Sequence, residues 1–216
     1  MRICPPLIEK GNSDKICPRS ASLTQESLDT CWMQYAVNLI ASNTSNPFTS
    51  VIVNHEYNTL MCEGISYGEN DPPGPYPGGS SPLYHGEISN LLNCSALYGP
   101  KCLNYSQMTM YSTGESCPMC ISAQWWYGLS RNVYATSIQK LRCLGIAQLM
   151  MPDVVLMQYA EGSPPIEIVP DVLANITDPL FLRFSSLKAL PAGWPASCQT
   201  PIVQGCSATS SPEPLP

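Results

Sequence analysis

The sequence predicts an α/β sandwich. Through the middle of the chain, short segments rich in apolar and β-branched residues alternate with longer segments whose apolar residues recur at helical spacing. The 22 prolines and 14 glycines interrupt the chain too often for a helical bundle. Apolar residues make up 44% of the 216 residues and charged residues 12%, which indicates one globular domain with a substantial core.

The individual elements follow from periodicity and from turn residues. Residues 23–40 predict a helix because Leu28, Trp32, Tyr35 and Leu39 fall on one helical face. The remaining elements are expected in this order: a hairpin of strands 48–53 and 59–62, a long Gly- and Pro-rich loop over 64–82, a helix over 85–97, a strand over 108–112, a helix over 118–129, a strand over 132–135, a helix over 137–149, and mixed helix and loop over 153–176.

Changes in composition mark two flanking segments. Residues 1–21 are polar and contain Cys4 and Cys17, which predicts an N-terminal arm held by a disulfide. Residues 191–216 are rich in Pro and Ser and predict a C-terminal tail. The central domain is therefore expected to span residues 22–190.

The 11 cysteines favour an oxidising compartment over the cytosol. Four N-x-S/T sequons favour the same compartment, at Asn43, Asn93, Asn104 and Asn175. Because no apolar signal segment opens the sequence, we expect a secreted protein whose leader has been removed. An intracellular chain with a disordered N-terminus that bears cysteines is the alternative.

Sequence alone does not determine which cysteines pair. Short loops favour the disulfides Cys4–Cys17, Cys94–Cys102 and Cys198–Cys206. Cysteines in predicted helices or strands fit buried free thiols instead, at Cys31, Cys62 and Cys143.

The charge balance is acidic, with a formal net charge of −6. A protein that follows a nucleic-acid backbone needs a basic face, so a nucleic-acid partner is disfavoured. The basic residues in the middle of the chain could contact one phosphate rather than a strand: Lys101, Arg131, Lys140 and Arg142. No apolar run approaches the roughly 18 residues of a transmembrane helix, so no membrane partner is expected. Whether the chain forms a homodimer is left open.

Two short motifs contain residues suited to metal chemistry. His85-Gly86-Glu87 and Cys117-Pro118-Met119-Cys120 each stand at the expected start of a helix. Zn²⁺ prefers tetrahedral N and S ligands, so His85, Cys117 and Cys120 could bind zinc and leave a fourth position for water. Glu87 is two residues from a ligand and could move protons to and from that water. A Cys117–Cys120 disulfide is the alternative, but it does not account for the His-x-Glu step.

The order H-x-E followed by C-x-x-C is typical of zinc nucleobase deaminases, in which the glutamate is the general acid and base. The stretches 82–88 and 111–120 resemble the cytidine deaminase superfamily. Residues 122–137 are similar to its guanine deaminase and tRNA adenosine deaminase branch, and the Val172–Pro179 segment resembles secreted fungal deaminase-like proteins. The resemblance covers about residues 22–184. It implies a three-layer α/β/α sandwich with a mixed sheet of about five strands.

The resemblance also implies candidate substrate residues. Asn70 is the nearest candidate for an asparagine that contacts a purine base, and Phe181 could close a pocket from the C-terminal segment. Trp126 could stack on a base, although packing is favoured over a substrate role for both aromatic residues. Ser116 departs from the family pattern, which usually has proline before the first cysteine, and this puts the fine geometry of the turn in doubt.

Three functions compete at this stage. The first is a zinc hydrolase that releases ammonia from the exocyclic amine of a nucleobase, nucleoside or nucleotide, with purines slightly favoured. The second is a non-catalytic secreted binding protein or effector that keeps the fold and a structural zinc. Glu87 favours the hydrolase, because a structural site has no use for an acid beside an open coordination position. The third, a nucleic-acid editor, conflicts with the acidic charge.

Overall fold

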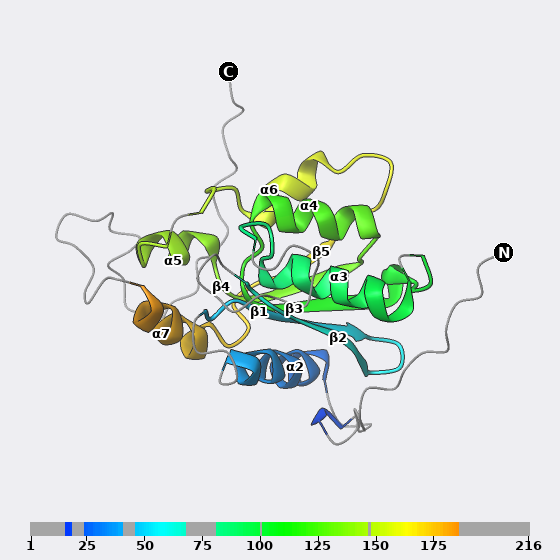
Figure 1. Cartoon of the computed structure of the whole chain (residues 1–216), viewed down its shortest axis with the longest axis horizontal. Coiled ribbons are helices and arrows are strands. Elements are labelled where there is room, and N and C mark those ends of the chain that lie inside the picture. The colour runs from blue at the N-terminus through cyan, green and yellow to red at the C-terminus, as the bar shows by residue number, and fades with distance from the viewer. Residues whose placement is uncertain are drawn as a thin grey trace.

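A five-stranded mixed sheet forms the centre of the computed structural model, with strand order β2-β1-β3-β4-β5 (Figure 1). The structure describes residues 16–18, 24–40, 46–67, 81–99, 101–146 and 148–185. β1 pairs antiparallel with β2 and β3, whereas β4 pairs parallel with β3 and β5. The strands are β1 (Thr49–Asn54), β2 (Thr59–Ile65), β3 (Met108–Gly114), β4 (Arg131–Thr136) and β5 (Glu167–Val169).

Helices cover both faces of this sheet, and in Figure 1 α2 and α7 lie below it while α3 and α4 lie above it. Alternate residues of β1 point to opposite faces, as the two-residue period of a strand requires. Val51 packs with Trp32 of α2, whereas Ile52 packs with Leu91 of α3 and Ile121 of α4. These contacts confirm the expected three-layer α/β/α sandwich with five strands. The helices are α2 (Gln25–Ile40), α3 (Gly86–Tyr98), α4 (Pro118–Tyr127), α5 (Ile138–Cys143), α6 (Asp153–Leu156) and α7 (Ala174–Phe184).

Three elements differ from the sequence prediction. The helix expected over residues 137–149 ends at Cys143, because the chain turns at Gly145, which adopts a φ of 75°. β5 was not predicted, since its three residues are too few to show a period. α7 was not predicted either, since Pro179 stands inside it and reads as a helix breaker.

The disulfides correct most of the expected cysteine pairing. Cys17 is bonded to Cys31 of α2, not to Cys4, and Cys94 is bonded to Cys62 of β2, not to Cys102. Cys102 and Cys143 are each disulfide-bonded as well. The prediction that Cys31, Cys62 and Cys143 are free thiols was therefore wrong. The expected Cys198–Cys206 pair lies outside the described residues.

Most of the predicted flanking segments also lie outside the described residues, so the arm over 1–21 and the tail over 191–216 stay predictions. Within the part of the chain that the structure describes, no helix combines the length and the apolar character needed to cross a bilayer.

Candidate metal centre

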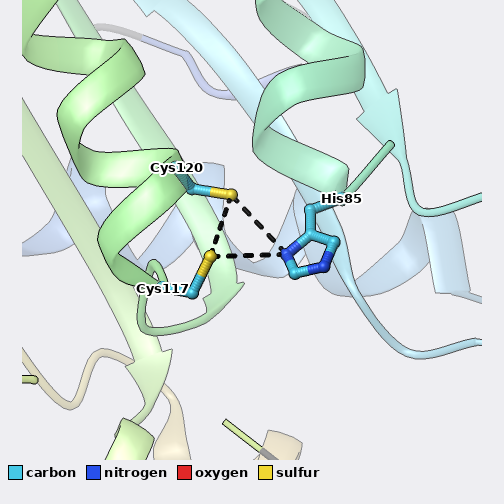
Figure 2. A group of neighbouring side chains, drawn as sticks. All are labelled: His85, Cys117 and Cys120. Carbon is cyan, nitrogen blue, oxygen red and sulfur yellow. Dashed lines mark hydrogen bonds between the residues drawn. The ribbon is translucent and has the colours of Figure 1, made fainter. Parts of the chain in front are cut away.

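The three predicted ligands come together where two helices begin (Figure 2). His85 immediately precedes α3, and Cys117 immediately precedes α4, so each residue occupies the N-cap position of its helix. Cys120 lies in the first turn of α4, on the same side as Cys117, because residues three apart share a helix face. All three side chains point toward one another. Within the described ranges, they form the one group of three or more His, Cys, Asp or Glu residues spaced for a metal ion.

The spacing of the three donor atoms is that of three corners of a tetrahedron. The Nδ1 atom of His85 lies 3.6 Å from the sulfur of Cys117 and 3.6 Å from that of Cys120, and the two sulfurs are 3.5 Å apart. Tetrahedral zinc with ordinary bond lengths places a nitrogen about 3.6 Å from a sulfur and two sulfurs about 3.8 Å apart. The donor set and its spacing thus fit Zn²⁺ with one coordination position left open.

The environment of the two thiols favours a thiolate. Cys117 has its pKa lowered to about 4, chiefly because the Cys120 thiol hydrogen-bonds to its sulfur and further because His85 does. Cys120 has its pKa raised, first by that shared hydrogen bond and then by burial. Both residues are free of disulfides, in contrast to the other described cysteines. The start of α4 adds a positive dipole end, which stabilises negative sulfur.

Glu87 lies in the first turn of α3 and is buried beside the ligands. The hydroxyl of Ser112, on β3, donates to its Oε1 atom at 3.4 Å. Burial raises the pKa of the Glu87 carboxyl, and the nearby charge of Cys117 raises it further. A carboxylate in such surroundings holds a proton more readily than one in water, which suits it to exchange protons.

The predicted substrate residues fall in three different places. Trp126 is 79% exposed and, together with Trp125 and Tyr159, lines a surface pocket of about 180 Å³ to which none of the three ligands contributes. Phe181 is fully buried and packs edge-to-face on Phe48, with ring centres 4.7 Å apart. Asn70 lies outside the described residues.

Sequence reasoning missed a buried polar network behind the ligand turn. The carboxylate of Glu115 accepts the backbone N–H groups of Ile138 at 2.7 Å and of Asp153 at 2.9 Å, and so caps α5 and α6 together. Asn132 of β4 donates to the Asp153 carboxylate at 2.9 Å and to the Ser116 hydroxyl at 3.4 Å. Glu115 and Ser116 directly precede Cys117, and this adjacency was the one signal in the sequence.

Comparison with solved structures identifies the fold. A guanine deaminase from Nitrosomonas europaea superposes with a TM-score of 0.58 at 18% identity, over 73% of this chain and 85% of that one. A protein solved with 2,6-diaminopurine gives 0.59 at 18% identity, over 74% and 83% of the two chains. A structure from a study of tRNA:A34 deaminases gives 0.51 at 16% identity, over 71% and 99%. No protein-family model matches the chain, and no curated protein matches it significantly. By the order of its strands, the position of its helices and these superpositions, the chain has the cytidine deaminase-like fold.

Proposed function

We propose that this protein is a zinc-dependent hydrolase that releases ammonia from the exocyclic amine of a nucleobase, nucleoside or nucleotide, with purines favoured. The observation that carries the proposal is the tetrahedral spacing of His85, Cys117 and Cys120 beside the buried Glu87. The fold shared with a guanine deaminase and with a protein that binds 2,6-diaminopurine supports a purine substrate.

In this proposal, His85, Cys117 and Cys120 hold the metal and leave one position open to solvent or substrate. A Zn²⁺ ion held by these residues would supply Lewis-acid activation of a water molecule for attack on the carbon that bears the amine. The two cysteines contribute negative charge, and the histidine contributes a neutral nitrogen. Because all three stand on or next to the first turns of α3 and α4, which pack on the sheet, the site is rigid.

Glu87 performs the proton transfers. Its carboxylate first accepts a proton from the attacking water and delivers it to the ring nitrogen. It then takes the remaining proton of that water, from the hydroxyl now on the substrate carbon, and gives it to the amine as the C–N bond breaks and the carbonyl forms. General acid–base catalysis of this kind contributes about 10²–10⁴-fold in rate. The Ser112 hydroxyl, which donates to Oε1, restricts the rotation of the carboxylate. Burial of Glu87 removes competing water from around it.

A small substrate suits the basic residues better than a nucleic acid does. Arg131 is bound by both terminal nitrogens to the Asp29 carboxylate, at 2.8 and 2.7 Å. The ammonium of Lys140 lies 4.0 Å from the Asp178 carboxylate. Two of the four basic residues in the middle of the chain are thus neutralised within the protein, which supports a free base or a nucleoside over a phosphate strand.

The proposal is tested by zinc content and ammonia release on one pair of variants. Wild type should contain one zinc per chain and release ammonia from at least one member of a panel of bases, nucleosides and nucleotides. Glu87→Gln should stay folded and zinc-loaded but lose turnover by at least about 10²-fold. Glu26→Gln is the matched control, because it removes the same charge from the first turn of α2, at an exposed position.

Two outcomes would contradict the proposal. Normal turnover in Glu87→Gln would show that the glutamate only stabilises its helix, which is worth about 0.3–1 kcal/mol. A zinc-loaded wild type that releases no ammonia from any substrate would favour the binding protein with a structural zinc.

We also infer that the protein works in an oxidising compartment outside the cytosol. Six of the nine cysteines that are not candidate ligands are disulfide-bonded in the described residues. Such bonding is rare in cytosolic proteins, where thiols are kept reduced. Mass spectrometry of protein purified from its natural source under non-reducing conditions tests this inference, and free thiols at these six positions would contradict it.

A further inference from the structure

Ser116 directly precedes the first cysteine ligand and is fully buried. Its hydroxyl oxygen accepts the side-chain amide N–H of Gln124 at 2.8 Å and, at 3.4 Å, that of Asn132. Ser116 is therefore held through its side chain, and it is the residue directly before Cys117.

The groups that hold Ser116 come from separate elements. Gln124 belongs to α4, two turns after Cys117, whereas Asn132 belongs to β4 and also donates to the carboxylate of Asp153, which begins α6. Gln124, Asn132 and Asp153 are each 0% exposed. The turn that presents the first cysteine is thus fixed relative to the sheet and, through Asn132, to the start of α6, rather than to its own helix alone.

This network does not satisfy all of its own polar atoms. Within the described residues, Gln124 Oε1 and Asn132 Oδ1 are buried and have no hydrogen-bond partner. A buried polar atom without a partner lowers stability, and an apolar side chain of the same shape would avoid that loss. In the described residues, both amides thus donate to the Ser116 hydroxyl while their own oxygens stay unpaired.

We propose that Ser116, Gln124 and Asn132 are positioning residues that hold the Cys117 sulfur at the distance a metal ion requires. The inference rests on the proposed zinc site. Zinc sites tolerate deviations of only about 0.2 Å in ligand distance, so a small rotation of the turn before Cys117 weakens binding. Groups that orient metal ligands through hydrogen bonds typically contribute about 10–100-fold in metal affinity.

Two substitutions test the proposal by zinc affinity. Ser116→Ala removes the shared acceptor, and Gln124→Leu removes the closer donor without changing the size of the side chain greatly. Each should raise the zinc dissociation constant by about 10–100-fold. The constant is measured by competition with a chromophoric chelator well below the melting temperature. The zinc affinity of the double variant should lie within about threefold of that of the more affected single variant, because both changes remove the same hydrogen bond.

The matched control is Tyr111→Phe. Like Ser116, Tyr111 is buried and hydrogen-bonded: it lies on β3, and its hydroxyl donates to Asp29 at 2.9 Å. Its ring, however, packs with α2 on the opposite face of the sheet. This variant should lose stability and keep wild-type zinc affinity. Absorption spectra of the Co²⁺-substituted proteins give a second readout, because the visible bands of tetrahedral Co²⁺ report on ligand geometry. They should change in Ser116→Ala and stay unchanged in Tyr111→Phe.

The outcomes separate this inference from the proposed function. A wild-type protein that binds no zinc would overturn the metal site and the hydrolase together. A wild type that binds zinc, with Ser116→Ala and Gln124→Leu both within twofold of it, would overturn only the positioning role. If Ser116→Ala does not fold, Gln124→Leu alone decides the question, since its Co²⁺ spectrum and zinc affinity are measured on folded protein. Should that variant fail to fold as well, the three residues are structural and the inference is wrong.

Discussion

Gly64 of β2 lies directly against the start of α3, and replacing it with alanine gives a sharp test of how that helix positions the site. A Cβ atom at this position would lie 2.1 Å from the backbone oxygen of Gly86 and 2.5 Å from the backbone nitrogen of Asn90. Ordinary van der Waals contact begins at 3.4 Å, so the first distance is about 1.3 Å too short. Both atoms belong to the main chain, and no side-chain rotation can relieve the clash.

The start of α3 must therefore move by about 1 Å in Gly64→Ala. Gly86 stands between His85 and Glu87, so this shift displaces one ligand and the proposed acid–base residue together. A displacement of that size is several times the tolerance of about 0.2 Å for metal ligands. We expect zinc affinity to fall by at least tenfold and turnover by about 10²-fold, with a loss of roughly 1–3 kcal/mol in unfolding free energy from overpacking.

The assay combines urea denaturation, zinc competition and ammonia release on the same preparation. Gly162→Ala is the control, because its Cβ meets nothing within 4 Å while its φ of 77° still costs about 1–2 kcal/mol. That variant should be destabilised and keep wild-type zinc affinity. If Gly64→Ala binds zinc as wild type does, the close approach of β2 to α3 does not position the ligand, and the reasoning is refuted.

Three further predictions concern other parts of the molecule. Asp29→Ala should lose about 3–5 kcal/mol in unfolding free energy, measured with urea, because it leaves the largely buried Arg131 guanidinium with only its 3.4 Å contact to the exposed Glu167 carboxylate. Replacing Cys62 and Cys94 by serine should lose about 3–4 kcal/mol, since their disulfide closes a loop of 32 residues, and an unchanged melting temperature would contradict this. When the chain is secreted from a eukaryotic host, glycopeptide mass spectrometry should find a glycan on Asn104, whose side chain is exposed in an N-x-S sequon; a consistently unmodified Asn104 would refute it.

The grouping of the three candidate ligands could be predicted because it depends on local sequence. Cysteines at positions i and i+3 with proline between them fix both the start of α4 and the face on which the sulfurs lie. The His-Gly-Glu motif likewise predicted the start of α3, where His85 is the N-cap residue. Only the closeness of the two helix starts depends on the tertiary fold, because α3 and α4 pack side by side on the same sheet.

The disulfides were not predictable by the same reasoning. Loop length favours pairs that are close in the chain, but packing in the folded state decides which sulfurs meet. Cys62 of β2 and Cys94 of α3 lie in the same hydrophobic core cluster. The packing of α3 on the sheet therefore brings the two sulfurs together, although they are 32 residues apart in the chain. Cys102, although only eight residues from Cys94, follows the turn at Gly99 and is disulfide-bonded to a different cysteine.

Ser116 illustrates which features of the site can be predicted from the sequence and which require the fold. The sequence marks it as a departure from the proline of related motifs, and a serine there suggests a looser turn. The structure instead shows a side chain held by amides from α4 and β4, 8 and 16 residues further along the chain. A proline restricts the backbone through its own ring, whereas a serine is restricted only by partners that the fold supplies. Candidate site residues can therefore be proposed from their spacing, whereas the hydrogen-bond partners of the residues between them depend on which strands and helices become neighbours.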